Sequence, residues 1–120
     1  MPPTPFSVGM SLGIDFGTSN TVVAMRDGDG RVQHQLFEGS PQLPSAVYLE
    51  DRTELVTGRE AIRLGFRNPA RFEPNPKRRI DDGTVLLAEE EVSVADLIAA
   101  VFARVAEECH RTLRSRRRIS

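Results

Sequence analysis

Residues that could bind a phosphate group lie close together near the start of the chain. Asp15 ends an apolar run, and Gly17, Thr18, Ser19 and Asn20 form the turn that follows it. A glycine lets the backbone approach a ligand closely, successive N–H groups of such a turn can point at phosphate oxygens, and the hydroxyl groups add donors. Asp15 would then hold a hydrated Mg²⁺ ion beside the phosphates. These residue types at this spacing predict a magnesium-phosphate site.

An ordinary β-hairpin turn is the alternative interpretation of the same residues. Glycine and asparagine accept positive φ values, and serine and threonine hydroxyls bond their own backbone. Asp15 favours the phosphate site, because a carboxylate that follows Leu12 and Ile14 in a strand fit for burial is costly unless it is paired, hydrated or near a metal ion. The chain has no G-x-x-x-x-G-K-[ST] or G-x-G-x-x-G pattern, which excludes a P-loop and a Rossmann-type site.

Residues 13–21, Gly-Ile-Asp-Phe-Gly-Thr-Ser-Asn-Thr, resemble the first phosphate loop of the actin-like ATPase superfamily, and in particular that of the DnaK-type (heat shock 70 kDa) chaperones. The resemblance implies an α/β fold, the N-terminal part of the first lobe of a ribonuclease H-like nucleotide-binding domain. Three later segments resemble the same family in the same order: residues 43–49 its Pro-Ser-x-Val strand, residues 56–61 its Val-Gly-x-x-Ala segment, and residues 72–80 its Lys-Arg-Leu-Ile-Gly stretch. In the last of these, Arg79 and Asp81 depart from the family pattern, in which leucine and glycine are usual.

The resemblance implies a site for Mg²⁺ with ATP or ADP, and ATP hydrolysis coupled to protein folding. Lys77 matches the lysine that reaches the γ-phosphate and the attacking water in the family, so Lys77 and Asp15 are the expected catalytic residues and residues 17–20 the expected nucleotide-binding turn. An ammonium group is a compact charge that can stabilise phosphoryl transfer. Without the resemblance, Lys77-Arg78-Arg79 would be interpreted as a solvated basic loop.

The resemblance covers nearly the whole chain but only a minor part of the family's length. The second phosphate loop, the acidic residues that position metal and water, the adenosine segment and the substrate-binding domain have no counterpart in these 120 residues. We therefore expect weak ATP binding and no significant turnover by this chain alone. Unfolded client proteins and co-chaperones are the partners implied for the full-length family. The alternatives are an actin-like cell-shape filament protein, a sugar or acetate kinase, and a non-enzymatic interaction module with a vestigial phosphate loop.

The first half of the chain predicts an antiparallel meander. Its strands are expected at residues 10–16, 21–27 and 31–37, with Asp27-Gly28-Asp29-Gly30 as a hairpin turn. Strand edges left unpaired in such a fragment are adhesive, so a homodimer through exposed edges is one expectation. Further expected elements are a strand near 45–50, a short strand at 54–57, a helix at 58–65, a proline-rich loop at 68–76, and a small hairpin of residues 84–87 and 91–92.

The last predicted element is an amphipathic helix. Ser93 is its expected cap, with Asp96 three residues further on. Residues 1–9 are expected to be a flexible proline-rich leader and residues 114–120 a basic tail, which leaves residues 10–113 as the lobe fragment. Apolar residues recur at helical spacing and predict a core face: Val94, Leu97, Ile98, Val101, Val105 and Cys109.

Composition and charge exclude several classes of protein. No apolar run is long enough to cross a membrane, and no Cys/His cluster has the spacing of a metal site. Cys109 is the single cysteine, which rules out an internal disulfide and favours a cytoplasmic location. Five arginines near the C-terminus suit either a nucleic-acid tail or a solvated helix end; all acidic residues precede residue 111 and no aromatic residues interleave, which favours the helix end over nucleic acid. They are Arg111, Arg114, Arg116, Arg117 and Arg118.

Overall fold

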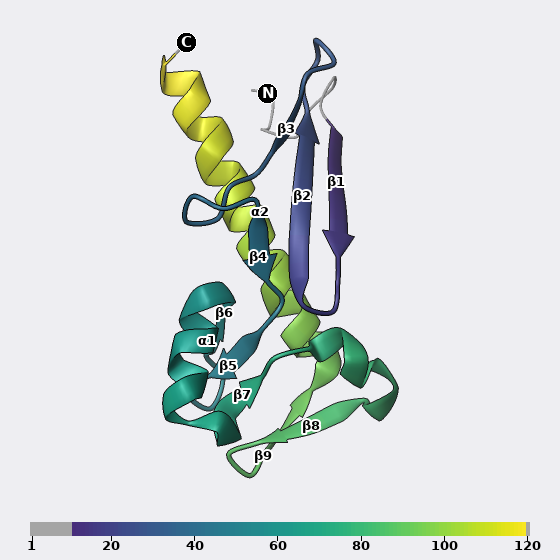
Figure 1. Cartoon of the computed structure of the whole chain (residues 1–120), viewed down its shortest axis with the longest axis vertical. Helices are drawn as coiled ribbons and strands as arrows, with labels where there is room; N and C mark the ends of the chain where they lie inside the picture. The colour runs from purple at the N-terminus through teal and green to yellow at the C-terminus, as the bar shows by residue number, and fades with distance from the viewer. Residues whose placement is uncertain (1–10, 120) are drawn as a thin grey trace.

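A computed structural model describes residues 11–119, apart from the side chains of residues 116–119. The chain is a mixed α/β protein in which a long helix, α2 (Val94–Ile119), runs behind small antiparallel sheets (Figure 1). The expected leader at residues 1–9 lies outside the described residues. No helix within the described part is long and apolar enough to span a membrane.

The predicted meander is present as one antiparallel sheet. Strands β1 (Ser11–Phe16), β2 (Asn20–Arg26) and β3 (Val32–His34) lie in that order, and β4 (Gln42–Pro44) pairs with the first residues of β2, beside β3. The turn between β2 and β3 forms at the expected residues, because the Asp27 carboxylate accepts hydrogen bonds from two N–H groups within it.

The third strand is shorter than the predicted 31–37. After His34 the Gln35 N–H still bonds to the Val23 carbonyl at 2.8 Å, but the chain then turns back at Glu38 and Gly39, which both have positive φ. This reversal brings β4 to the edge of β2 that β3 leaves free. Phe37, inside the reversal, is fully buried.

The predicted strand near residues 45–50 is confirmed as a shorter strand, β5 (Val47–Leu49), but the sequence did not predict the strand β4 that precedes it. Pro44 ends β4, since proline has no N–H group to continue the ladder. The chain then changes sheets across Ser45 and Ala46. Beyond them β5 (Val47–Leu49) lies between β6 (Leu55–Thr57) and β7 (Phe72–Glu73) in a second antiparallel sheet.

The segment after β6 contains more structure than the sequence predicts. Helix α1 (Gly58–Arg67) begins where expected and ends two residues later than expected. The expected loop at 68–76 contains a 3₁₀ turn, η1 (Pro69–Arg71), and the strand β7. A second 3₁₀ segment, η2 (Pro76–Asp82), follows, and the predicted hairpin is confirmed as β8 (Thr84–Leu87) and β9 (Glu90–Ser93).

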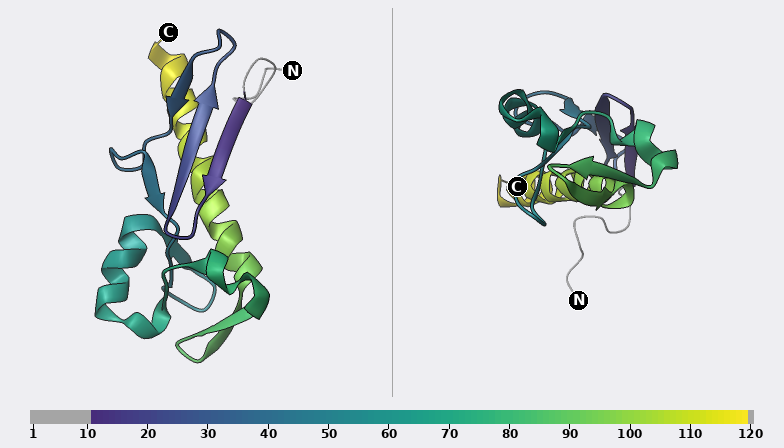
Figure 2. Two further views of the ribbon diagram at one scale, coloured as in Figure 1. Left: turned by 45° about the vertical axis from the view of Figure 1, so that its right-hand side comes forward. Right: turned by 90° about the horizontal axis from the view of Figure 1, so that it is seen from below.

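Helix α2 carries the core, as its spacing predicts. Its inward face packs against the inner side of the first sheet and against β5 (Figure 2). Ile98 lies at the border of that face and is half-buried. The helix continues through Ile119, so it includes most of the segment expected as a basic tail. The buried residues of this core include Val94, Leu97, Val101, Val105, Cys109 and Leu113 of α2, with Val23, Met25, Leu43, Val47 and Leu49 of the strands.

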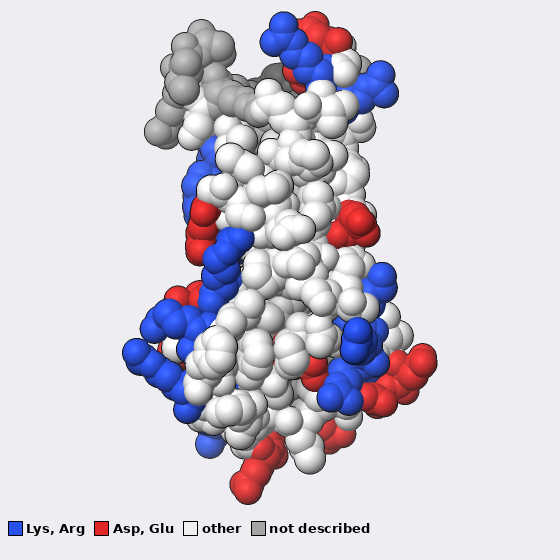
Figure 3. All heavy atoms as spheres, in the orientation of Figure 1, with Lys and Arg blue, Asp and Glu red and all other residues white. Residues whose placement is uncertain are grey.

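Strand β1 is exposed, contrary to the prediction of a buried strand. It pairs with β2 on one side, and no other described strand pairs with it. Leu12 and Ile14 lie opposite inward-facing residues of β2, yet they remain 37% and 39% exposed. Asp15 lies opposite Val22, on the face of the sheet that points away from α2. Figure 3 shows that this face carries few charged side chains over its centre.

Candidate phosphate-binding turn

The turn between β1 and β2 is tight enough to require glycine. The Gly17 N–H donates to the Asn20 carbonyl at 2.9 Å, which closes the hairpin. A Cβ atom at position 17 would lie 2.7 Å from that same carbonyl oxygen, a distance that side chains do not adopt. The hairpin alone therefore explains Gly17, and this residue does not distinguish the two interpretations of the turn.

Ser45 holds the turn from below. Its hydroxyl donates to the Gly17 carbonyl at 3.0 Å, and its N–H donates to the Ser19 carbonyl at 2.9 Å. The hydroxyl of Thr21 lies 3.0 Å from that of Ser45, and both residues are fully buried. The sequence placed Ser45 in the Pro-Ser segment that resembles the DnaK-type family, but did not predict its contact with the turn. No local pattern shows that the link between β4 and β5 passes next to residue 17.

Lys77 lies at the turn, 61 residues away in the sequence. Its Nζ donates to the Phe16 carbonyl at 2.9 Å and lies 6.0 Å from the centre of the Phe16 ring. The Phe16 ring packs against Phe102 of α2, with ring centres 5.4 Å apart. The structure thus brings together the turn and the lysine that the sequence singled out separately.

Asn75 is a contact that sequence reasoning missed. With its amide oriented so that the nitrogen faces acceptors, the side chain donates to the Thr18 carbonyl at 2.7 Å and to the Pro74 carbonyl at 3.1 Å. Two side chains therefore reach the turn from this segment: Asn75, just before η2, and Lys77, within the first turn of η2. Only Lys77 could be found from the sequence, through the resemblance of its segment.

The backbone carbonyl groups of the turn are bonded within the protein, whereas two of its N–H groups point to no acceptor among residues 11–119. The carbonyl groups of five consecutive residues, 16–20, all accept hydrogen bonds from within the protein. The N–H groups of Thr18 and Ser19 have no recorded partner among residues 11–119. Consecutive N–H groups without acceptors, next to a lysine, form an arrangement suited to an anion.

Asp15 lies beside the turn, but it is not a buried carboxylate, as the sequence argument for a metal ion assumed. It is exposed, so its carboxylate carries no desolvation cost that a metal ion would have to offset. It has no ion pair or hydrogen bond with another described side chain. No group of three or more His, Cys, Asp or Glu residues within the described part could hold a metal ion. One exposed carboxylate next to phosphate oxygens still fits Mg²⁺, which retains several waters in such sites.

The basic run does not act as one surface. Lys77 bonds to the turn, whereas Arg79 lies 3.1 Å from Glu73 and 3.7 Å from Asp82. Arg78 is exposed. All three side chains are exposed, which fits a solvated segment, but their surroundings differ, and only Lys77 bonds to the turn.

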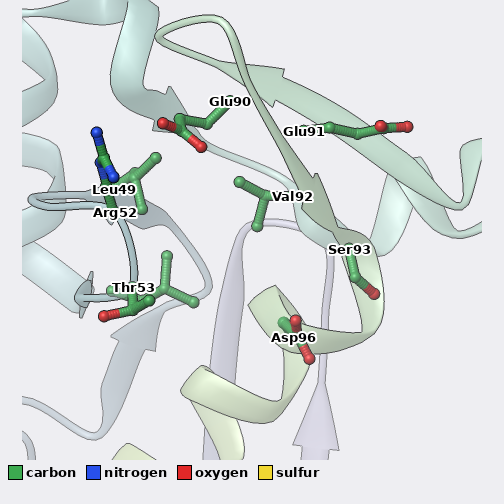
Figure 4. Close-up of a pocket in the computed structure, with 9 residues that line it drawn as sticks. Leu49, Arg52, Thr53, Glu90, Glu91, Val92, Ser93 and Asp96 are labelled. Carbon is green, nitrogen blue, oxygen red and sulfur yellow. The ribbon is translucent and has the colours of Figure 1, made fainter.

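A separate cavity of about 260 Å³ lies at the other side of the second sheet (Figure 4). Leu49, Leu55 and Val92 form its apolar wall. Arg52, in the loop between β5 and β6, and Glu90, the first residue of β9, also line it (Figure 4). None of its lining residues belongs to the turn or to the Lys77 loop, so it is distinct from the candidate site.

Comparisons with known proteins show that most of the chain is similar to a small part of a chaperone. No protein-family model matches the chain. The chain is 32% identical over 93 residues to "Chaperone protein dnaK1" of Prochlorococcus marinus, one of 61 curated proteins with significant matches. The match covers 78% of this chain but 14% of that chaperone, so the chain spans a small part of its relative's length. The relation to the DnaK (heat shock 70 kDa) family is distant and partial.

Proposed function

We propose that residues 17–20 bind the phosphate groups of Mg-ATP or Mg-ADP, and that the chain supplies this phosphate loop to a DnaK-type chaperone ATPase. The observation that carries the proposal is the polarity of the turn. Every carbonyl from residue 16 to residue 20 is bonded within the protein, while the Thr18 and Ser19 N–H groups are left for a ligand. A simple hairpin does not need three distant side chains to hold its carbonyls in place.

Each predicted site residue has a role in this proposal. The N–H groups and hydroxyls of Thr18 and Ser19 would bond to phosphate oxygens. Asp15 would orient Mg²⁺ through its bound waters. An ammonium group has three donors, so Lys77 can keep its bond to Phe16 and still offer two donors to a γ-phosphate or to the attacking water.

This chain would form one wall of an actin-like nucleotide cleft. Phosphoryl transfer depends on charges placed around all sides of the transferred group, so one wall alone should bind weakly and turn over negligibly. In the whole ATPase, nucleotide binding would be coupled to the affinity for unfolded clients and co-chaperones in the cytoplasm.

Calorimetric titration of Mg-ATP and Mg-ADP into the full chain tests the proposal. We expect saturable binding that is lost in Asp15→Ala and Lys77→Ala. Asp29→Ala, in the turn at the opposite end of β2, is the matched control and should bind like the wild type. In parallel, the amide resonances of Thr18 and Ser19 should shift on nucleotide addition.

Two outcomes would replace the proposal. A folded chain that gives neither heat nor amide shifts would be an interaction module whose phosphate loop is vestigial. Filaments that form on addition of ATP would favour the actin-like filament protein instead.

A further inference from the structure

A buried carboxylate lies behind the loop that carries Asn75 and Lys77. Glu73, the last residue of β7, is 5% exposed. Its Oε1 accepts a hydrogen bond from Arg79 Nε at 3.1 Å, and its Oε2 accepts one from the Asn75 N–H at 2.8 Å. A buried carboxylate is costly unless both oxygens are bonded, so Glu73 constrains the two residues that bond to it.

We infer that Glu73 is a positioning residue, which sets Asn75 and Lys77 against the phosphate turn. Its carboxylate joins the start of the loop to Arg79, six residues further on, and so spans both sides of Lys77. The same carboxylate fixes the backbone of Asn75, whose side chain reaches the Thr18 carbonyl. That Glu73 positions these residues does not depend on the proposed function; that the positioning serves phosphate binding does.

Two prolines let the carboxylate act over this distance. Pro74 and Pro76 flank Asn75, and each proline fixes its own φ and restricts the residue before it to extended conformations. Asn75 has φ of −139° and ψ of 72°, outside the helical region, and Pro76 is fully buried. With these dihedral angles restricted, anchoring residue 73 also sets where the side chain of Lys77 begins.

Arg79 is better placed to hold Glu73 than to contact a phosphate. Its guanidinium lies between two carboxylates, those of Glu73 and Asp82, which share its charge. It stands where the resembling family usually has leucine, so the ion pair is a property of this chain. A leucine at this position would leave the bond from the Asn75 N–H to Glu73 intact and remove the ion pairs of Arg79 with Glu73 and Asp82.

Lys77 is the only lysine in the chain, which gives a direct readout. The bond to the Phe16 carbonyl restrains the Lys77 amine, so an acylating reagent should reach this amine more slowly than that of an unrestrained lysine. We expect N-hydroxysuccinimidyl acetate to modify Lys77 about two- to fivefold faster in Glu73→Ala, Glu73→Gln and Arg79→Leu than in the wild type, the range that corresponds to ~0.5–1 kcal/mol for one hydrogen bond. The α-amino group of the same chain provides an internal reference rate.

Two controls separate positioning from general destabilisation. Glu90→Gln changes an exposed carboxylate on β9 and should leave the Lys77 rate unchanged. Val105→Ala destabilises the core on α2, away from the loop, and in its folded state should also leave the rate unchanged. If Glu73→Ala does not fold, Glu73→Gln and Arg79→Leu decide the result.

The same variants separate this inference from the proposed function. Unchanged Lys77 rates in folded Glu73→Gln and Arg79→Leu would overturn the inference, whatever the chain binds. Faster rates in a chain that binds no Mg-ADP would leave Glu73 as a positioning residue and refute the phosphate site. Faster rates together with weaker Mg-ADP binding would support both.

Discussion

Strand β1 and one face of helix α2 are both apolar, but only the face of α2 is buried. Leu97, Val101 and Val105 of α2 are at most 1% exposed, whereas Leu12 and Ile14 of β1 are each more than a third exposed. The helix buries its face against two sheets at once, while β1 pairs with one strand among residues 11–119. Apolar composition thus predicts which face could be buried, and the number of neighbouring elements decides whether it is.

Truncation of the α2 face should have the largest effect on stability. Leu97→Ala removes a fully buried side chain from the junction of both sheets, so we expect a loss of about 2–5 kcal/mol in the free energy of unfolding. Urea denaturation followed by circular dichroism measures this change. A smaller loss for Leu97→Ala than for a truncation in β1, such as Ile14→Ala, would contradict the contrast between the buried face of α2 and the exposed strand β1.

A smaller but still clear loss is expected at the end of β1, where the strand meets its turn. Gly17→Ala places a Cβ atom 2.7 Å from the Asn20 carbonyl, and we expect this overlap to cost about 1–3 kcal/mol. Thermal unfolding measures the cost, and the Thr18 and Ser19 amide resonances report whether the turn has changed. Gly13→Ala, with no atom within 4 Å of the added Cβ, is the matched control on the same strand.

The thiol of α2 should make stability depend on pH. Burial, and to a lesser degree the charge of Glu108, raises the pKa of Cys109. A raised pKa in the folded state means that the thiol's stabilisation is complete below the pKa of the unfolded thiol, about 8.5, and is lost as the pH rises through the folded value. We expect the wild type to lose more stability than Cys109→Ala between neutral and strongly alkaline pH. Equal losses in the two proteins would show that the thiol does not contribute.

The smallest effect is expected along β1 itself. Ile14→Ala removes a side chain that is already 39% exposed, so its loss should stay below about 1 kcal/mol. The same urea experiment applies, with Val23→Ala on the buried face of β2 as the contrasting variant. A large effect at Ile14 would mean that a further strand or a second chain covers this edge. The homodimer through exposed edges stays a prediction, and β1 is the strand to which it applies.

The sequence predicted individual helices, strands and turns better than it predicted which strands pair with one another. The spacing on α2 and the turn at Asp27 are local, and both are confirmed. The change of sheets at Ser45 depends on where β2 begins, because Pro44 pairs with the first residue of β2, and β7 has only two residues, too few to show a pattern. Neither could be predicted without knowing the sheet that each strand joins.

The candidate site divides in the same way. Residues 17–20 and Lys77 were found from the composition of the turn and from a family resemblance. Ser45 and Asn75 were missed because each bonds to a turn residue far away in the sequence, and Glu73 was missed because its neighbours Asn75 and Arg79 gave no sign that its carboxylate is buried. The contacts span 28 residues for Ser45 and 61 for Lys77, and only the fold makes them.

The position of Ser45 has a consequence for how the molecule opens. Ser45 is the first residue of the two-residue link between the two main sheets and, at the same time, donates to two carbonyls of the turn. Pulling the sheets apart would break those bonds, and unwinding the hairpin would expose the buried hydroxyls beneath it. In hydrogen-exchange terms, the two sheets and the turn should open together as one cooperative unit, with amide protons on both sides of Ser45 exchanging at a common rate.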